Sequence, residues 1–252
     1  MSFLKNTIGE FEKGETKVMQ QSAGDENQAC TLNDARVQAM LDRLHRKARG
    51  DVIRLPGMLF SELLDKILKR NPSTKDRGRR MKNIFVPLSR KQGTFAYLVA
   101  RSIKAQRILE FGTSFGISTI YFAAAVKDNG GGIVIGSEIE ETKAARARQH
   151  LGEAGLSEYA DIRIGDARQT LADPGGPVDL VLMDGWKDLY LPLINILAPH
   201  IRPGGIVLSD NIYTFKRALA PYVAHMENPA NGFQSVTLPL RDGLQYSVRL
   251  SA

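Results

Sequence analysis

Charged and amide side chains follow two apolar runs in the second half of this chain. Val178 to Met183 is followed by Asp184, and Ile206 to Ser209 is followed by Asp210 and Asn211. Both runs are typical of buried parallel strands, which end at one edge of an open sheet, where ligands bind. Two carboxylates and an amide that converge there repel one another unless a cation neutralises them. Their hard oxygen donors suit Mg²⁺, with Mn²⁺ or Ca²⁺ as competitors. A plain turn after the second strand is the alternative.

A glycine loop precedes these residues in the segment ILEFGTSFGIST, residues 108–119. Its pattern predicts a strand, a loop with Gly112 and Gly116, and a helix. Gly112 allows a tight turn and a close backbone approach, and the new helix directs unpaired N–H groups at an anion. A simple strand-to-helix connection is the alternative. The spacing is not the GxGxxG of dinucleotide-binding loops, which counts against a nicotinamide enzyme. We interpret Glu110 as holding the loop in place.

Glu138 ends the next apolar run, GIVIGSE. An acid about 20 residues beyond a glycine loop can accept hydrogen bonds from both hydroxyls of a ribose. Together the loop and Glu138 indicate a ribose-containing cofactor. A solvent-exposed acid beside Glu140 and Glu141 is the alternative for this residue. Asp166 and Ala167 follow the next strand at the same edge and could contact an adenine.

Strands and helices alternate from Arg107 to the C-terminus, and they must position these residues. We expect strands at Arg107 to Phe111, Gly132 to Ser137, Asp161 to Ile164, Val178 to Met183, Ile206 to Ser209, Phe233 to Leu238 and Leu244 to Leu250. We expect helices at Ser118 to Val126, Glu141 to Ala154, Leu191 to Ala198 and Ala218 to His225. This order predicts an α/β fold with a mostly parallel sheet and helices on both faces. The final hairpin would set an antiparallel strand into that sheet.

The N-terminal third has a different composition. Residues 1–30 are polar and predict a flexible tail. Helical spacing follows at Val37 to Leu44, with Asn33 or Asp34 as a candidate N-cap, then at Leu59 to Leu68 and at Gln92 to Ile103. We expect residues 31–252 to form one domain, in which residues 31–83 act as a helical lid or interface.

Basic residues are concentrated between positions 41 and 91. This stretch carries fifteen Lys and Arg residues against five Asp and Glu, in a chain whose net charge is +7. A solvated helical surface explains this pattern, and so does a surface that attracts an anionic substrate or a nucleic acid. Aromatic residues are not interleaved with the basic ones as in base-stacking surfaces, so nucleic acid is the secondary interpretation.

Cys30 is the only cysteine of the chain. A single cysteine excludes an internal disulfide framework and a zinc site built on a cysteine cluster, and it fits a reducing compartment. We find no apolar run of about 18 residues, and the first residues carry charges where a signal peptide has its apolar core. We therefore expect a cytoplasmic protein without a membrane span.

Several of these motifs together resemble the class I S-adenosylmethionine methyltransferases: Glu110–Gly112–Gly116, Glu138, Gly165-Asp166-Ala167 and DGWKD. More narrowly, they resemble the cation-dependent O-methyltransferases, the group of catechol and caffeoyl-coenzyme A O-methyltransferases and their bacterial relatives. The resemblance runs from about Val86 to the C-terminus and includes the closing LPLRDGL. It implies a Rossmann-like methyltransferase fold with seven strands, S-adenosylmethionine as cofactor and a divalent cation, Mg²⁺ first.

The resemblance also implies a role for each matching residue. Asp184, Asp210 and Asn211 would bind the cation. Lys187 would be the general base that removes a hydroxyl proton, with a surface ion pair to Asp188 as the alternative. The implied cofactor-binding set is Leu88, Glu110, Gly112, Gly116, Ser118, Glu138, Asp166, Ala167, Asp184 and Trp186. In this set Ser118 and the backbone near Leu88 would hold the methionine carboxylate. Trp186 would lie against the adenine, unless it is a core tryptophan.

The sequence departs from the family in the region of the acceptor. Gly185 stands where the catechol enzyme has a histidine, and no carboxylate matches its substrate-orienting acid. The chain between Asn211 and Phe233 is also shorter than in the bacterial relatives. We expect methyl transfer to a hydroxyl of a small catechol-like or phenolic acceptor by a homodimer. The alternatives are a hydroxylated nucleoside in tRNA as acceptor, a nicotinamide-dependent oxidoreductase, and a binding module without catalysis.

Overall fold

The computed structural model describes residues 30–51, residue 76 and residues 88–251. The chain divides into Met1–Cys30 and Thr31–Ala252, and the helices and strands described here belong to the second unit. The predicted tail, the helix expected at Leu59 to Leu68 and most of the basic stretch lie outside the described residues.

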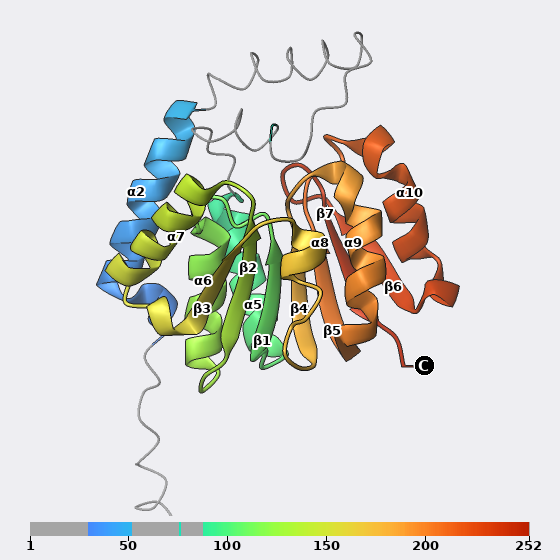
Figure 1. Ribbon diagram of the computed structural model, residues 1–252, viewed down its shortest axis with the longest axis horizontal. Helices are drawn as coiled ribbons and strands as arrows, with labels where there is room; N and C mark the ends of the chain where they lie inside the picture. Colours follow the sequence, from blue (N-terminus) through green and yellow to red (C-terminus); the bar gives the residue numbers. More distant parts are fainter. Residues whose placement is uncertain (1–29, 52–75, 77–87, 252) are drawn as a thin grey trace, which may run out of the picture. The chain divides into compact units, whose positions relative to one another are not determined.

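Seven strands form one sheet in the order β3-β2-β1-β4-β5-β7-β6 (Figure 1). They are β1 (Arg107–Phe111), β2 (Ile133–Glu138), β3 (Ala160–Ile164), β4 (Val178–Met183), β5 (Ile201–Ser209), β6 (Phe233–Leu238) and β7 (Leu244–Arg249). The first five strands are parallel to one another, whereas β7 is antiparallel to both β5 and β6. The predicted fold, a mostly parallel sheet with an inserted antiparallel strand, is confirmed.

Helices cover both faces of the sheet. One layer contains α2 (Ala35–Asp51), α5 (Arg90–Ser102), α6 (Ile117–Asp128) and α7 (Glu141–Glu153). The other contains α8 (Ala167–Thr170), α9 (Tyr190–Leu197) and α10 (Lys216–Glu227). In Figure 1, α8 and α9 lie in front of the sheet and α5 lies behind it. Among the described helices, none combines the length and the apolar character that a membrane crossing requires.

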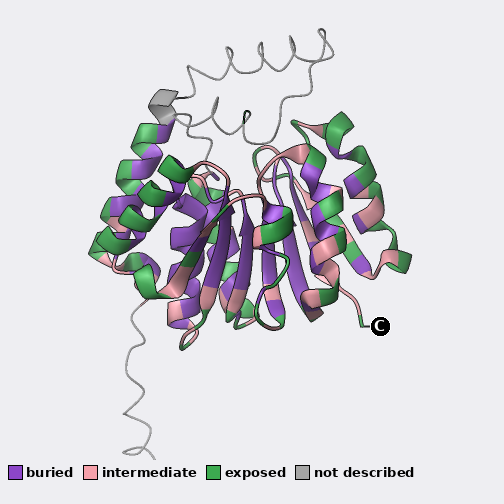
Figure 2. Cartoon of the chain, viewed as in Figure 1, coloured by how far each residue is buried: buried purple, intermediate pink, exposed green. Residues whose placement is uncertain are grey.

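The strands are apolar on both sides because both of their faces are covered. Leu109 and Phe111 of β1 belong to the core shared with α9 and α10. The alternate residue Glu110 faces α6, where it accepts a hydrogen bond from Thr119. Figure 2 shows the resulting pattern, with buried strands in the centre and helices that are buried toward the sheet and exposed on the outside.

Two elements differ from those that the sequence predicts. β5 begins at Ile201 rather than Ile206, and its pairing with β4 is irregular between Val178 and Leu180. The Pro203-Gly204-Gly205 segment is typical of a turn, so its pattern predicts that the strand begins only after it. The one-turn helix α8 was not predicted. Of the two candidate caps of α2, Asp34 accepts a hydrogen bond from the Arg36 amide at 2.8 Å.

Candidate active site

The candidate residues meet at the edge where the parallel strands end. Backbone hydrogen bonds join each strand end to its neighbour: Gly165 N donates to Glu138 O, Gly112 N to Ser137 O, Asp184 N to Phe111 O and Asp210 N to Met183 O, at 2.9 to 3.2 Å. This is the edge at which open α/β sheets bind ligands. The glycine loop, Glu138, Asp166 and the acidic cluster therefore lie along one continuous rim.

Gly112 has a φ of +100°, a conformation that favours glycine. A Cβ atom at this position would lie 2.7 Å from the backbone oxygen of Asp184. The close approach predicted for Gly112 is therefore to the strand-end backbone of β4, so this glycine joins the two halves of the site. Gly116 also has a positive φ, +83°, and lies immediately before α6.

Glu110 is fully buried behind the glycine loop. Its Oε2 accepts hydrogen bonds from the hydroxyls of Thr113, at 2.8 Å, and Thr119, at 2.6 Å. Burial raises the pKa of this carboxyl group, and the hydroxyl donors, Ser118 included, oppose that shift. These bonds agree with the interpretation that Glu110 holds the loop. The cofactor-binding role implied for Glu110 stays a prediction.

Glu138 is 8% exposed, so the alternative of a solvent-exposed acid is wrong. Its two carboxylate oxygens accept hydrogen bonds at 2.8 Å from the amides of Ser114 and Glu140. Ser114 has a φ of +51°, and the bond to Glu138 holds this strained residue of the glycine loop. Each carboxylate oxygen keeps a further lone pair for a ligand.

The remaining residues of the cofactor-binding set lie on the same rim or next to it. Asp166 caps α8 by accepting from the Arg168 amide at 2.9 Å, and it forms an ion pair with the Arg168 side chain at 2.6 Å. Ala167 is buried directly after it. Ser118 is 7% exposed in the first turn of α6, and Leu88 is buried just before α5. Trp186 is partly buried against the core, which leaves both of its interpretations open.

The structure brings together the three proposed metal ligands and Lys187. The Lys187 ammonium donates to Asn211 Oδ1 at 2.6 Å and lies 3.7 Å from Asp184 Oδ1. Asn211 Nδ2 donates to Asp210 Oδ2 at 3.1 Å. Asn211 has a φ of +69°, an uncommon conformation for a residue with a side chain and one that occurs often at functional sites.

Burial and like charge make this cluster electrostatically unfavourable by itself. Burial raises the pKa of Asp184 well above its ordinary value, and the nearby charge of Asp210 raises it further. Burial also raises the pKa of Asp210 and lowers that of Lys187. The ammonium lies against oxygens of two proposed ligands, so the donor set already attracts a positive charge. Within the described residues no three His, Cys, Asp or Glu side chains gather as a metal site; the two carboxylates and one amide seen here are hard oxygen donors that fit Mg²⁺.

Sequence reasoning missed the residues that hold this cluster. The Tyr190 hydroxyl accepts from Lys187 at 2.9 Å and donates to Met183 O at 2.7 Å. The Lys187 ammonium also lies 5.5 Å from the centre of the Phe215 ring. Gln92 donates to Asp210. Among these residues, only Gln92 belongs to a recognisable sequence pattern. Ser89 and Gln92 have the spacing of a capping box, which predicts the start of a helix.

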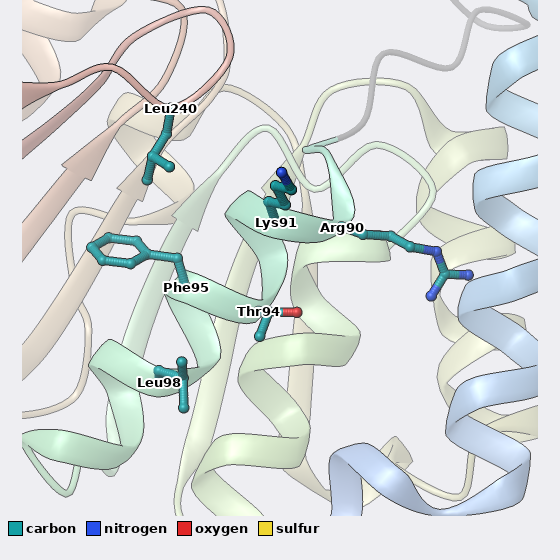
Figure 3. A pocket seen from close by; sticks show the side chains of 6 residues that line it. All are labelled: Arg90, Lys91, Thr94, Phe95, Leu98 and Leu240. Atoms are coloured by element: carbon teal, nitrogen blue, oxygen red, sulfur yellow. The ribbon is translucent and has the colours of Figure 1, made fainter.

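A shallow pocket lies between α5 and Leu240 (Figure 3). Phe95 and Leu240 point toward one another across it, while Arg90 extends toward α2 and forms an ion pair with Asp42. The complete lining is Arg90, Lys91, Thr94, Phe95, Leu98 and Leu240. None of the predicted site residues belongs to it, so this pocket is not the candidate active site.

Comparisons with known proteins agree with the fold. Residues 109–212 match the family described as "Methyltransferase domain". A catechol O-methyltransferase from Niastella koreensis is 34% identical over 131 residues, which cover 50% of this chain and 58% of that protein. The chain thus spans less than two thirds of the length of the curated relatives that match it with this identity.

Two solved structures extend the likeness. Cofactor-bound Rv0187 from MTB is 25% identical with a TM-score of 0.62, over 77% of this chain and 97% of that one. The O-methyltransferase TomG from Streptomyces achromogenes, in complex with S-adenosylmethionine, is 22% identical with a TM-score of 0.61, over 82% and 98%. At this identity the second likeness shows the fold alone.

The fold, the site and the matched region define the class: the chain contains a methyltransferase domain with a Rossmann-like fold. Within that class, the relatives that it resembles include catechol O-methyltransferases, at 34% identity, and a caffeoyl-CoA O-methyltransferase from Zea mays, at 25% identity. The resemblance predicted from the motifs is confirmed, and it replaces the nicotinamide-dependent alternative.

Proposed function

We propose that this protein transfers the methyl group of S-adenosylmethionine to a hydroxyl of a small catechol-like or phenolic acceptor, with a divalent cation bound at Asp184, Asp210 and Asn211. One observation carries the proposal. A buried carboxylate, a partly buried one, an amide and a lysine converge at the ligand-binding edge of a methyltransferase sheet. The catechol O-methyltransferase match supports the acceptor class.

The cofactor would occupy the β1–β2 side of the rim. Glu138 would accept hydrogen bonds from the ribose hydroxyls, and its burial beside the loop supports this role. The loop from Gly112 to Gly116 would lie along the cofactor, with Ser118 and the backbone at Leu88 at its methionine end. Asp166, Ala167 and Trp186 would contact the adenine.

The cation would be held by the oxygens of Asp184, Asp210 and Asn211. When bound, Mg²⁺ supplies positive charge that fixes two adjacent acceptor oxygens and lowers the pKa of a bound hydroxyl. The chemistry of the donor set supports this assignment, because removal from water raises the pKa of both carboxylates, Asp210 being buried and Asp184 partly buried.

Lys187 would take the hydroxyl proton at its Nζ atom. Burial lowers the pKa of Lys187, which favours the neutral amine that a base requires. Tyr190 and Asn211 hold the Nζ atom at 2.9 and 2.6 Å, and Phe215 covers it. Tyr190 is itself bonded to the end of β4, so the amine is positioned relative to Asp184.

The sequence offers two classes of acceptor. The alternative of a nucleoside in tRNA depends on the basic stretch between residues 41 and 91, most of which lies outside the described residues. A homodimer and a cytoplasmic location stay predictions. The small phenolic acceptor is therefore the proposal that the described residues support best.

Methyl transfer to a panel of catechols, caffeoyl esters and hydroxybenzoates tests this proposal. Each acceptor is assayed with Mg²⁺ and with EDTA, for the unaltered protein and for Asp184→Ala and Lys187→Ala. We expect turnover that is lost with EDTA and in both variants. Turnover that is insensitive to EDTA would contradict the metal assignment and leave the cofactor assignment intact. No turnover, with S-adenosylmethionine still bound, would contradict the small phenolic acceptor.

A further inference from the structure

Gln92 connects the start of α5 to the proposed metal site. It is 1% exposed, and its Nε2 donates to Asp210 Oδ1 at 2.6 Å. The two residues are 118 positions apart in the sequence. A buried hydrogen bond to a carboxylate is stronger than one between neutral groups, and a missing partner there is costly.

The other end of the Gln92 amide is held by Ser89. Gln92 Oε1 accepts from Ser89 N at 3.0 Å and from Ser89 Oγ at 2.8 Å, while Gln92 N donates to Ser89 Oγ at 3.2 Å. This capping box begins α5. Because Ser89 N can only donate, it requires the amide oxygen on its side. That requirement directs the amide nitrogen of Gln92 at Asp210.

Besides the bond from its backbone N to Met183 O, Asp210 has three further partners. Gln92 binds Oδ1, Asn211 Nδ2 binds Oδ2 at 3.1 Å, and the Tyr190 hydroxyl lies 3.3 Å from the backbone oxygen. Of these three partners, only Gln92 comes from the helix layer behind the sheet. Gln92 and Asn211 both bond the Asp210 carboxylate and so set its rotation. Of the two, Asn211 is a proposed ligand and a contact of Lys187, whereas Gln92 is neither.

We infer that Gln92 is a positioning residue for the metal ligand Asp210, and that its amide fixes the direction of the carboxylate toward the bound cation. The inference rests on the proposed function, since it requires the metal site. Partners that orient metal ligands contribute roughly 10- to 100-fold to metal affinity. Gln92 also carries the cap of α5, so metal affinity and helix stability must be separated experimentally.

Two kinds of variant separate these roles. Gln92→Met removes the amide at similar volume, and Gln92→Asn keeps an amide that is too short to reach both partners. Ser89→Ala is the matched control, because it removes the hydroxyl of the cap and leaves the Gln92–Asp210 bond. Mn²⁺ affinity is measured by electron paramagnetic resonance on the full chain without cofactor or acceptor, and the melting temperature is measured in parallel.

We expect lower melting temperatures in all three variants. We expect Mn²⁺ affinity to fall roughly 10- to 100-fold in the two Gln92 variants and to stay at the wild-type value in Ser89→Ala. If the Gln92 variants bind Mn²⁺ as Ser89→Ala does, Gln92 is only a helix cap and the inference is overturned, while the proposed function stands. If the unaltered protein does not bind Mn²⁺, the metal site and the inference fail together.

Discussion

The two sides of the candidate site satisfy their buried carboxylates in different ways. On the β1–β2 side, Glu110 and Glu138 receive hydrogen bonds from hydroxyls and backbone amides of the adjoining loops and of α6. On the β4–β5 side, Asp184 and Asp210 lie close enough for the charge of Asp210 to raise the pKa of Asp184, and Lys187 balances only part of that charge.

This difference separates a region held mainly by hydrogen bonds from one that concentrates like charge. Neutral donors bond three of the four carboxylate oxygens on the β1–β2 side, and only Glu110 Oε1 is buried there without a hydrogen-bond partner. The β4–β5 side concentrates buried like charge, an arrangement that costs stability and that functional sites accept. If this comparison is right, the two sides should respond oppositely when a carboxylate is replaced by its amide.

The largest effect is expected for Lys187→Met. Removing the proposed base should lower the rate of methyl transfer by roughly 10²- to 10⁴-fold, because general base catalysis contributes that much. Cofactor affinity, measured by calorimetry, should stay unchanged, since Lys187 contacts only the β4–β5 side. Unchanged turnover would show that Lys187 is an ion-pairing residue.

Asp184→Asn should separate activity from stability. Loss of a proposed metal ligand should reduce turnover by at least about 100-fold, because residues that only orient such ligands can already contribute that much. Stability without metal should rise, because one of two neighbouring like charges is removed. Chemical denaturation in EDTA measures the second effect. A destabilised variant would contradict the description of this side as charge-strained.

Glu138→Gln is the matched change on the β1–β2 side. It should weaken S-adenosylmethionine binding roughly tenfold, since hydrogen bonds to a charged group contribute about 1.5 to 3 kcal/mol. In contrast to Asp184→Asn, it should also lower the melting temperature, because an acceptor of two backbone amides becomes partly a donor. Calorimetry and thermal unfolding provide the two readings. Equal or higher stability would remove the contrast between the two sides.

The smallest effect concerns His150 of α7, behind the glycine loop. Burial lowers its pKa below the ordinary value of 6.5, while its Nδ1 lies 2.9 Å from Phe115 O. A histidine with a lowered folded-state pKa stabilises the protein fully above its unfolded pKa. That stability is lost as the pH falls from about 6.5 through the folded-state pKa.

His150→Gln should therefore reduce the drop in melting temperature between about pH 7.5 and about pH 5.5. The variant keeps a hydrogen-bond donor for Phe115 but does not titrate. Thermal unfolding across this range measures the slope for both proteins. An unchanged slope would mean that another group governs the acid sensitivity of the β1–β2 side.

Much of the fold and the rim could be predicted from local pattern. Alternating apolar runs and helical spacing predict the order of the elements, and parallel strands must end at one edge. That rule alone brings Asp184, Asp210 and Asn211 together. The local pattern gave a wrong start for β5, which begins at Ile201, because the Pro-Gly-Gly segment inside this strand is typical of a turn.

Contacts between distant segments could not be predicted in this way. The sequence places Glu138 at the end of a strand, but only the folded loop buries it and supplies the Ser114 amide. Likewise, the capping box predicts that Ser89 and Gln92 interact, whereas the bond from Gln92 to Asp210 depends on how α5 packs against the sheet.

By itself, then, the sequence determined the class of fold, the edge that carries the chemistry and the residues that lie there, because these follow from spacing along single elements. The tertiary structure alone decided which of those groups are buried and which neighbours donate hydrogen bonds to them. It also decided which carboxylates lie close to a like charge without enough positive charge beside them. Those properties depend on side chains that only packing brings within hydrogen-bonding distance.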